Sequence, residues 1–428
     1  MTIHKVRGTR DIIPFDRYLQ LYKILRSHLE FNHFKEIHTP YFEYAELFTK
    51  NLGTGTDIVN KEMYFLSHIH QENTDPKMVL RPELTASIMR AFLEESIQET
   101  PWKVFEIGPA FRHERPQKGR YREFFQCSIE CINAKSIGYD LELVCLLYSL
   151  FKKLIPGNFQ LQINYIGTAL ERKSYREALY NYCLTKKILL PQSIQDKLQE
   201  ETILRILDSK DTVVQNMIIN APKISDFWSS NNQKDWNIIT MGLADLNISF
   251  IHNERLIRGL DYYNGLIFEF TSTTLGAQNT FCGGGRYDGL ANNINEKNDT
   301  PALGAGIGID RLLLIMEENK KTTVINNTKF IAIIIETNLP QSAYSHSLTI
   351  THYCEKNNIR SKIYFDKESL KSGLKKANIE NALLACIITD TQIQNNTLII
   401  KEMQDGKKQI ELSFHQALEY ITQYNHNE

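Results

Sequence analysis

The 428-residue sequence has no long apolar run and no segment typical of membrane insertion. No apolar stretch approaches the ~20 residues that a membrane-spanning helix needs. The first ten residues are polar and lack the apolar region of a secretory signal. We therefore expect a cytoplasmic protein with no membrane partner.

Cysteine is sparse, and its spacing shows no paired motif. The seven cysteines form an odd number and include no Cys-x-x-Cys pair, which argues against a disulfide framework and against structural zinc. Cys127 and Cys131 lie in a strand-like run, and we expect both in the core. We assign no metal ligand among the protein side chains.

An excess of charge of one sign is also absent. Lysine plus arginine number 49 and aspartate plus glutamate 50, so the formal charge is −1. The whole molecule therefore has no net attraction for nucleic acid, and any RNA contact must come from local patches. A hydrophobic fraction of 42% supports a proper core, and the length predicts two to four domains.

The most informative stretch runs from Phe111 to Glu130. Its second half alternates as a strand does, with Phe125, Cys127 and Ile129 on one face and Phe124, Gln126, Ser128 and Glu130 on the other. A face meant only for burial would not carry Gln126 and Glu130 beside an aromatic ring. A ring next to fixed acceptors instead indicates the lining of a polar ligand site.

The first half of this stretch predicts a hairpin with a cationic tip. Pro116 and Gly119 supply a turn, and residues 112–122 carry five basic residues against one acid. On these residues alone, a solvated charged loop is an equally good interpretation. The order Phe-Arg-x-Glu, loop, then a strand bearing Phe resembles motif 2 of the class II aminoacyl-tRNA synthetases.

Two other segments are similar to the remaining motifs of that family. An amphipathic helix pattern with Phe15, Tyr18, Leu21, Tyr22, Leu25 and Leu29 on one stripe ends before Pro40. It resembles motif 1, which builds the dimer interface in the family, although any amphipathic helix would fit. Residues 302–316 predict a small-residue strand that passes into an apolar helix, and they resemble motif 3.

Arg311 would lie in the first turn of that last helix. A cation there opposes the helix macrodipole by about 0.3 to 1 kcal/mol, whereas a bound phosphate would reverse the sign. Family members usually have Glu before this arginine. Here it is Asp310, one methylene shorter, which leaves its supporting contact open.

Three strings resemble the histidyl-tRNA synthetase family in particular. They are Arg-Pro-Glu-Leu-Thr at 81–85, Arg-Leu-Ile-Arg-Gly-Leu-Asp-Tyr-Tyr-Asn at 255–264, and Cys-Gly-Gly-Gly-Arg-Tyr-Asp-Gly-Leu at 282–290. Taken singly, Glu83 and Thr85 could equally cap a helix or lie at the surface. Leu84 stands where the family usually has Gly, so the backbone approach there is expected to be tighter or shifted.

The resemblance implies an α+β protein. We expect a class II catalytic domain with an antiparallel sheet at 1–320, a helical insertion at about 168–246, and a linker at 321–328. The last part, 329–428, alternates strand and helix patterns and resembles an α/β anticodon-binding domain.

The resemblance also implies ATP-dependent charging of tRNA-His with L-histidine. By similarity, Arg112 contacts the α-phosphate and Arg311 the γ-phosphate, while Phe124 stacks on adenine with Glu114 near its amino group. Mg²⁺ is expected on the β- and γ-phosphates. Guanidinium groups suit these positions because they stay charged and bind phosphate oxygens as a fork.

The amino acid would bind beside the nucleotide. Arg258 would lie between the substrate carboxylate and the α-phosphate. Neutral imidazole offers one donor and one acceptor, so its recognition needs partners of both kinds. By motif match these are Glu130 and Tyr263, with Tyr262 as a wall, and the α-ammonium partners are Glu83, Thr85 and Gln126.

For the tRNA, the resemblance places Arg115 and Gln117 toward the acceptor stem. Lys371, Lys375 and Lys376 in the last domain are candidates for phosphate contact, although lysines on a helix are more often solvated. The family also implies a homodimer.

Two alternatives stay open at this point. A catalytically silent relative, such as a histidine-sensing regulatory subunit, would keep the fold but typically lose signature residues and the last domain. Another class IIa enzyme, for proline, threonine or glycine, would lack the strings at 255–264 and 282–290. The presence of Arg112, Arg258 and Arg311 favours an active histidine enzyme.

Overall fold

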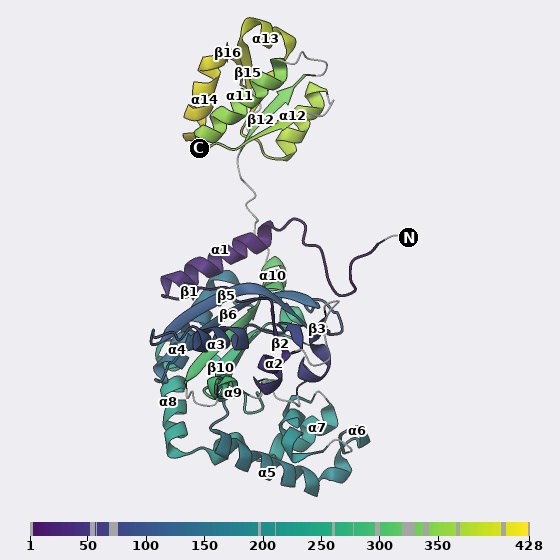
Figure 1. The fold of residues 1–428 in the computed structure, drawn as a ribbon, viewed down its shortest axis with the longest axis vertical. Coiled ribbons are helices and arrows are strands. Elements are labelled where there is room, and N and C mark those ends of the chain that lie inside the picture. Colours follow the sequence, from purple (N-terminus) through teal and green to yellow (C-terminus); the bar gives the residue numbers. More distant parts are fainter. Residues whose placement is uncertain are drawn as a thin grey trace. The chain divides into compact units, whose positions relative to one another are not determined.

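The computed structural model describes residues 3–51, 56, 58–67, 76–195, 198–209, 211–258, 262–276, 278–295, 300–318, 330–336, 342–364, 369–403 and 408–426. The chain divides into two compact units, residues 1–322 and residues 323–428, which are described separately below (Figure 1). The predicted linker at 321–328 lies outside the described residues.

The first unit is built on an eight-stranded sheet in the order β1-β5-β6-β11-β10-β9-β7-β8. The strands are β1 (Lys35–Glu36), β5 (Trp102–Phe111), β6 (Glu123–Ile132), β7 (Gln160–Tyr165), β8 (Phe250–His252), β9 (Asn264–Thr271), β10 (Thr280–Arg286) and β11 (Ala302–Gly308). The six central strands are antiparallel, and only the edge strands β1 and β8 run parallel to their neighbours. The predicted antiparallel catalytic sheet is confirmed. A second, small sheet contains β2 (Phe42–Tyr44), β4 (Met78–Leu80) and β3 (Tyr64–Leu66).

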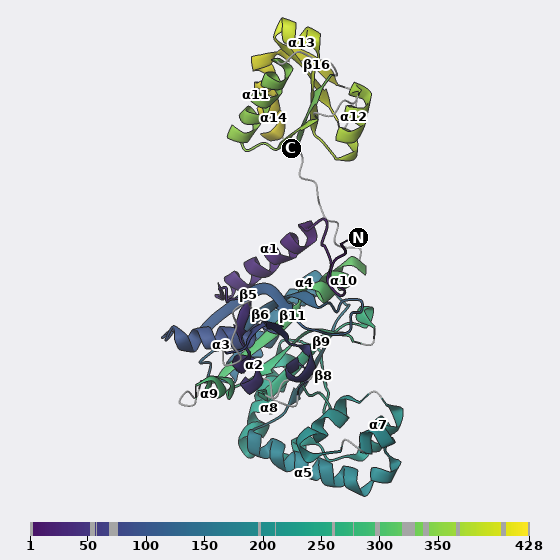
Figure 2. The ribbon, with the colours of Figure 1, turned by 45° about the vertical axis from the view of Figure 1, so that its right-hand side comes forward.

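Helices cover both faces of the large sheet, as Figures 1 and 2 show. One face packs against α1 (Asp16–Phe31), α4 (Gly138–Leu154), α8 (Ser230–Asp245) and α10 (Ile309–Glu318). The other packs against α2 (Ala45–Asn51), α3 (Thr85–Glu94) and α9 (Leu290–Ile294). A short π-helix, η1 (Ile58–Glu62), and a 3₁₀ turn, η6 (Thr273–Leu275), complete the unit.

The alternation in β6 decides which side chains reach which face. Cys127 and Ile129 are fully buried in the core beneath α1 and α4, as the sequence predicts. The stripe on α1 behaves similarly, because Leu21 and Leu25 are buried in that core. Phe15 is an exception: it precedes the helix and is 40% exposed, so its place in the buried stripe is wrong.

Residues 168–229 form a helical layer with its own small core. It contains α5 (Ala169–Thr185), η2 (Lys187–Leu189), α6 (Gln192–Gln195), η3 (Glu200–Asp208), α7 (Thr212–Met217), η4 (Ile218–Asn220) and η5 (Ile224–Phe227). Helix α5 begins at a capping box, in which Thr168 accepts from the Glu171 amide and Glu171 accepts from the Thr168 amide. The following helix, α8, returns to the main core through Trp236, Ile239 and Leu243.

The second unit is a five-stranded mixed sheet in the order β13-β12-β14-β15-β16. Its elements are β12 (Ile331–Ile335), α11 (Ser342–Lys356), β13 (Ser361–Tyr364), α12 (Leu370–Ile379), β14 (Leu384–Ile388), α13 (Asp390–Asn395), β15 (Thr397–Glu402), β16 (Gln409–Ser413) and α14 (Phe414–His426). The first three strands in the order are parallel and the last pairs antiparallel, which confirms the predicted α/β domain.

Candidate active site

The predicted hairpin is present. Strands β5 and β6 pair antiparallel from Trp102 with Ile132 to Phe111 with Glu123. At the tip, Gln117 and Arg120 exchange backbone hydrogen bonds of 3.1 and 2.9 Å, and Gly119 adopts a φ of +73° that favours glycine. Arg115 and Gln117 are exposed at this tip.

Arg112 and Phe124 lie together at the base of the hairpin. The Arg112 guanidinium is 5.3 Å from the centroid of the Phe124 ring, and its Nε donates to the Pro82 carbonyl at 2.8 Å. Burial lowers the pKa of Arg112, whereas the charges of Glu62 and Glu83 oppose this shift. The side chain is therefore fixed through its Nε by a backbone carbonyl.

Glu114 is buried beside Arg112, with 3.8 Å between its Oε1 and the nearest Arg112 nitrogen. Its other oxygen forms an ion pair with Arg120. Glu114 therefore lies close to Arg112, one of the predicted nucleotide-binding residues. It also forms an ion pair with a second arginine, Arg120.

Arg311 lies at the start of α10 and reaches back to the hairpin. Its Nε donates to the Gly119 carbonyl at 3.2 Å, and Nη1 donates to the Thr280 carbonyl. Burial lowers the pKa of Arg311, and the positive charges of Arg120 and Arg112 lower it further. Arg112 and Arg311 therefore lie within electrostatic reach of each other, although 199 positions separate them in the sequence.

Asp310 has the supporting contacts that the sequence left open. Its Oδ2 accepts from the Phe125 amide at 2.9 Å, and Oδ1 accepts from the Tyr18 hydroxyl and pairs with Arg10. The shorter acid thus joins the start of α10 to the strand that carries Phe124. The N-terminal segment completes this junction, because the Arg122 amide donates to the Gly8 carbonyl at 2.9 Å.

Arg258 lies across β10. Its Nη1 is 3.1 Å from Glu269 Oε1, and its guanidinium is 5.4 Å from the Tyr263 ring centroid. A Cβ atom at Gly283 would overlap the guanidinium, so a larger residue there would displace Arg258. Burial lowers the pKa of Arg258, but Tyr263 and Glu269 raise it above the usual value overall. The charge of Arg258 also lowers the pKa of Arg112, so the two groups lie within electrostatic reach of each other.

Glu130 forms the centre of a buried polar cluster. Its Oε1 accepts from Thr85 Oγ1 at 2.8 Å and Ser128 Oγ at 2.7 Å, and Oε2 accepts from the Tyr287 hydroxyl. Burial raises the pKa of Glu130 to about 8, against the opposing effect of these donors. The carboxylate lies over Gly304 of β11, where a Cβ would overlap it.

Three buried tyrosines pack against one another beside this cluster. The ring centroids of Tyr262 and Tyr263 are 4.7 Å apart, and the Tyr287 ring lies 5.6 and 6.4 Å from them. Burial raises the pKa of Tyr263, with Arg258 acting against the shift and Glu130 adding to it. Tyr263 is therefore close enough to Glu130 for the two groups to interact electrostatically.

Tyr287 was not predicted as a site residue. It lies in the string 282–290 and donates its hydroxyl hydrogen to Glu130 across 157 positions. The available signal was its place in that string, since nothing in the local pattern indicates the contact.

Glu83 caps helix α3. Its carboxylate accepts from the backbone amides of Thr85 at 2.7 Å and Ala86 at 2.8 Å, and burial raises its pKa. The capping interpretation is therefore confirmed for Glu83. Leu84 is fully buried with an ordinary φ of −103°, so the leucine is accommodated there without a left-handed backbone conformation. Gln126 lies over Gly306, on the same face of β6 as Glu130.

Neither a metal cluster nor a membrane span is found in the part of the chain that the structure describes. No three His, Cys, Asp or Glu side chains there are placed to hold a metal ion together. Among the same residues, no helix combines the length and apolar character that crossing a membrane requires.

Comparison of the chain with known proteins identifies its family. Residues 8–312 match the family model of histidyl-tRNA synthetase. The chain belongs to the histidyl-tRNA synthetase family. Within this family, the histidine–tRNA ligase of Wolbachia pipientis subsp. Culex pipiens (strain wPip) is 38% identical over 415 residues, covering 96% of this chain and 98% of the relative. The chloroplastic histidine–tRNA ligase of Porphyra purpurea is 34% identical and covers 98% and 96%.

Solved structures of the histidyl-tRNA synthetase family share the fold. The enzyme from S. aureus superposes with a TM-score of 0.79 at 26% identity, covering 98% of this chain and all of that one. A Bacillus halodurans protein described as an ATP phosphoribosyltransferase regulatory subunit/histidyl-tRNA synthetase reaches 0.62 at 19% identity, covering 91% and 99%. At that identity the second match shows the fold alone. The resemblance predicted from the sequence motifs is confirmed.

Proposed function

We propose that this protein is a histidine–tRNA ligase. It activates L-histidine with ATP to histidyl-adenylate and transfers the histidyl group to the 3′ end of tRNA-His, releasing AMP and pyrophosphate. The proposal is supported by Arg112 lying beside Phe124, by Arg258 lying beside Tyr263, and by the electrostatic coupling of Arg112 to both Arg258 and Arg311.

In the first step, a histidine carboxylate oxygen attacks the α-phosphorus of ATP and pyrophosphate leaves. A carboxylate is already ionised at pH 7, so this step needs no general base. It needs positioning and charge neutralisation. Arg112 holds the α-phosphate, Arg311 holds the γ-phosphate, and Arg258 bridges the carboxylate and the α-phosphate.

The nucleotide base binds at the hairpin. Phe124 stacks on adenine, and Glu114 lies near the adenine amino group. This arrangement is supported by the Arg112 guanidinium, which already lies 5.3 Å from the ring. Mg²⁺ enters with ATP as part of the substrate, and its ligands are the β- and γ-phosphates.

Histidine binds with its imidazole between Glu130 and Tyr263, and Tyr262 forms the wall of the pocket. Glu130 accepts the ring N–H and the Tyr263 hydroxyl is the other partner. Thr85, Glu83 and Gln126 hold the α-ammonium. Glu83 already accepts two backbone amides, but a carboxylate has further lone pairs for this contact.

In the second step, the 3′-hydroxyl of the terminal tRNA adenosine attacks the adenylate carbonyl and AMP leaves. Arg115 and Gln117 meet the acceptor stem, which their exposure at the hairpin tip allows. The second unit binds the anticodon. Its lysines on α12 contact phosphate groups of the tRNA backbone, and they are Lys371, Lys375 and Lys376.

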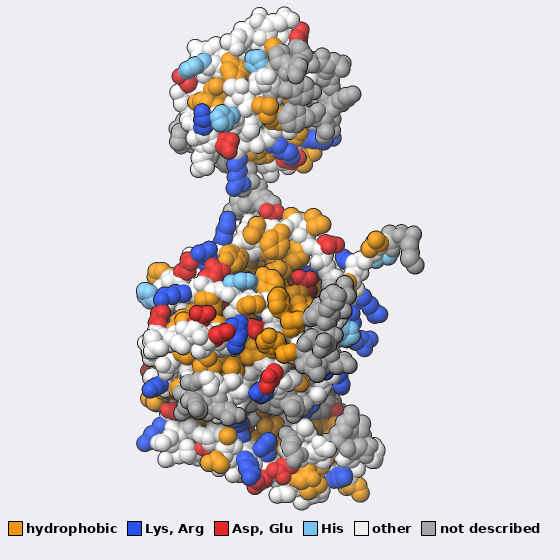
Figure 3. Space-filling view, viewed as in Figure 1, with side chains coloured by type: hydrophobic (Ala, Val, Ile, Leu, Met, Phe, Trp, Pro, Cys, Tyr) orange, Lys and Arg blue, Asp and Glu red, His pale blue; other side chains and the backbone are white. Residues whose placement is uncertain are grey.

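The active form is a cytoplasmic homodimer. Apolar side chains remain exposed on α1 and β2, where Phe31 is 84%, Phe42 56% and Tyr44 59% exposed. Figure 3 shows apolar side chains gathered on this face of the first unit. An exposed apolar surface of this kind is typical of a protein interface.

The deciding experiment is histidine-dependent exchange of pyrophosphate into ATP, measured with a panel of amino acids. We expect exchange with L-histidine and none with proline, threonine or glycine. A regulatory protein that only binds histidine would give no exchange with any amino acid, and that outcome would reject the proposal.

The anticodon role is tested by deleting residues 328–428. We expect the shortened protein to retain histidine-dependent exchange and to lose aminoacylation of intact tRNA. Undiminished aminoacylation would show that the second unit does not contribute to tRNA binding.

A further inference from the structure

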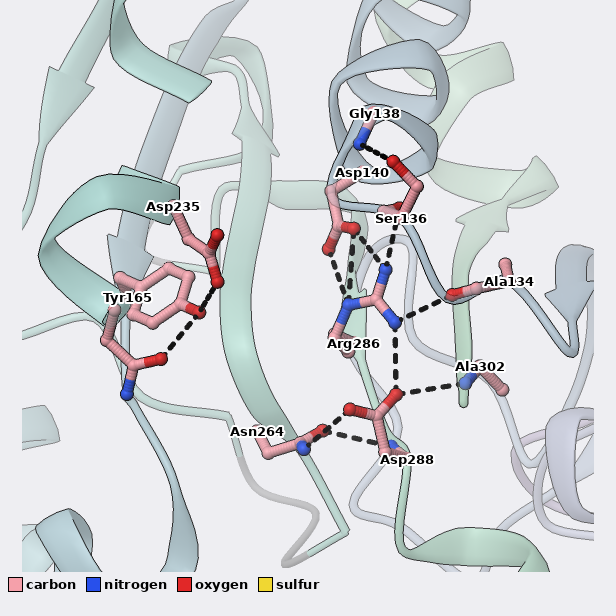
Figure 4. Close-up of polar contacts among 11 residues, drawn as sticks. Ala134, Ser136, Gly138, Asp140, Tyr165, Asp235, Asn264, Arg286, Asp288 and Ala302 are labelled. Atoms are coloured by element: carbon pink, nitrogen blue, oxygen red, sulfur yellow. Dashed lines mark hydrogen bonds and ion pairs between the residues drawn. The ribbon is translucent and has the colours of Figure 1, made fainter. Parts of the chain in front are cut away.

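A largely buried polar network in the first unit has no part in the mechanism above (Figure 4). At its centre is Arg286, at the end of β10. Its Nε lies 3.1 Å from Asp140 Oδ1, Nη1 donates to the Ala134 carbonyl at 2.9 Å, and Nη2 donates to the Ser136 carbonyl at 3.4 Å. Asp140 is fully buried in the first turn of α4. The guanidinium is therefore fixed by a buried carboxylate and two backbone carbonyl oxygens.

A second carboxylate connects this arginine to the neighbouring strand. Asp288 Oδ1 accepts from Arg286 Nη1 at 3.1 Å and from the Ala302 amide at 3.0 Å. Its Oδ2 accepts from Asn264 Nδ2 at 3.0 Å, and the Asp288 amide donates back to Asn264 Oδ1 at 2.9 Å. This reciprocal pair joins the two strings, 255–264 and 282–290, that carry the pocket tyrosines.

The network holds the two tyrosines by their chain neighbours. Asn264 directly follows Tyr263, and Tyr287 lies between Arg286 and Asp288. The pairing of β9 and β10 shifts register between Gly285 and Arg286, so the strand is irregular where Tyr287 leaves it. Bulges of this kind re-aim side chains near active sites, and they need other contacts to fix the new direction.

We propose that Asp140, Arg286, Asp288 and Asn264 form a positioning network that sets Tyr263 and Tyr287 against Glu130 and thereby determines affinity for the imidazole ring. The proposal rests on the proposed function. These four residues act through the tyrosines and do not touch the substrate. The network is specific to the histidine end, because none of its hydrogen bonds among the described residues reaches Arg112, Arg311 or Phe124.

The test is Asp288→Asn in the full-length enzyme. The side chain of asparagine has one acceptor oxygen and one donor nitrogen, whereas all three neighbours of Asp288 donate to it. If the oxygen keeps the bonds from Arg286 and Ala302, the new amide nitrogen faces Asn264 Nδ2, which is also a donor. We expect KM for histidine in pyrophosphate exchange to rise about tenfold, with KM for ATP changed less than about twofold. Binding of L-histidinol, which keeps the imidazole and lacks the carboxylate, should weaken by the same factor as binding of histidine.

The matched rescue is the double variant Asn264→Asp, Asp288→Asn. It exchanges the acid and the amide, so the side-chain bond forms again in the opposite sense, and KM for histidine should return to within about twofold of wild type. If Asp288→Asn does not fold, Asn264→Ser removes the same link while leaving the carboxylate with Arg286, and it should show the same shift in KM.

The control is Asp235→Asn. Asp235 accepts from the Tyr165 hydroxyl at 3.2 Å and lies outside the network, as Figure 4 shows. This variant should leave KM for histidine unchanged.

Wild-type enzyme without histidine-dependent exchange would reject the proposed function itself. If wild type is active and KM for histidine is unchanged in Asp288→Asn, the positioning network is rejected. A parallel rise in both KM values with a lower melting temperature would also reject it, because the network would then only support the fold.

Discussion

At the histidine end of the site, neutral hydroxyl donors hold Glu130, whereas at the phosphate end backbone carbonyl oxygens hold Arg112 and Arg311. Hydroxyl donors satisfy a buried carboxyl without supplying a countercharge, so burial dominates and its pKa rises. Carbonyl oxygens orient a guanidinium without neutralising it, because they carry no full charge. The first end is therefore suited to select an uncharged ring and the second to attract phosphate.

Arg258 lies where the two ends meet, and its removal should have the largest effect. We expect Arg258→Ala to lower the rate of histidine-dependent pyrophosphate exchange by about 10²- to 10³-fold, as for other preorganised groups that stabilise developing charge. Arg255→Ala, three positions earlier in the same string, serves as the control and should be far less impaired. An exchange rate for Arg258→Ala equal to that of wild type would show that Arg258 has no role in the reaction. The histidine end and the phosphate end would then not be linked through this residue.

Gly304→Ala tests how tightly the histidine end is packed. The new methyl group would overlap the Glu130 carboxylate and displace it, so we expect a fall in kcat/KM for histidine of about 10²-fold. Gly289→Ala is the matched control, since a Cβ there meets open space and the residue has an ordinary φ of −80°. Equal activity of the two variants would mean that the position of Glu130 is not critical.

Local patterns predicted much of this arrangement. The alternation in residues 124–130 predicted both faces of β6, because a strand with one polar face has a period of two. The hairpin tip was predicted from its turn residues, Pro116 and Gly119. In the second unit, however, α13, β16 and α14 were not predicted from the pattern.

Contacts between distant positions were not predictable from those patterns. The bonds from Tyr287 to Glu130 and from Tyr18 to Asp310 span 157 and 292 positions. They depend on how the sheet brings its strands together, which no periodicity encodes. Glu83 illustrates a further limit of prediction from sequence. The string at 81–85 that contains it is compatible both with a helix cap and with a ligand site.

The raised pKa of Glu130 predicts a pH dependence confined to the histidine end. The folded protein keeps this proton up to about pH 8, whereas the unfolded chain releases it near pH 4.3. The folded state then binds more protons between these values, so its stability falls as the pH rises through that window. Glu130→Gln should abolish this contribution to the pH dependence, which amounts to at most about 5 kcal/mol over the whole window.

The measurement is the melting temperature of both proteins from pH 5 to pH 8.5 without substrates. Asp140 also has a pKa raised by burial, to about 6, but it titrates in both proteins and cancels in the difference. Two profiles that run parallel would show that Glu130 is already ionised in the folded protein, and the contrast between the two ends would lose its electrostatic basis.

The smallest effect is expected at the phosphate end, from Arg10→Gln. Arg10 pairs with Asp310, which accepts from the Phe125 amide, and its guanidinium lies 3.9 Å from the centroid of the Tyr121 ring. Its loss should loosen the junction between Arg311 and the adenine strand, raising KM for ATP about threefold while KM for histidine stays constant.

Arg17→Gln is the control for that variant, since it breaks an exposed ion pair with Glu317 that also joins α1 to α10. Exposed pairs of this kind contribute less than about 1 kcal/mol, so kinetics should be unchanged. If Arg10→Gln instead raised KM for histidine, the N-terminal segment would support the amino-acid pocket. The two ends of the site would then share one scaffold, because the same buried acid would be holding both.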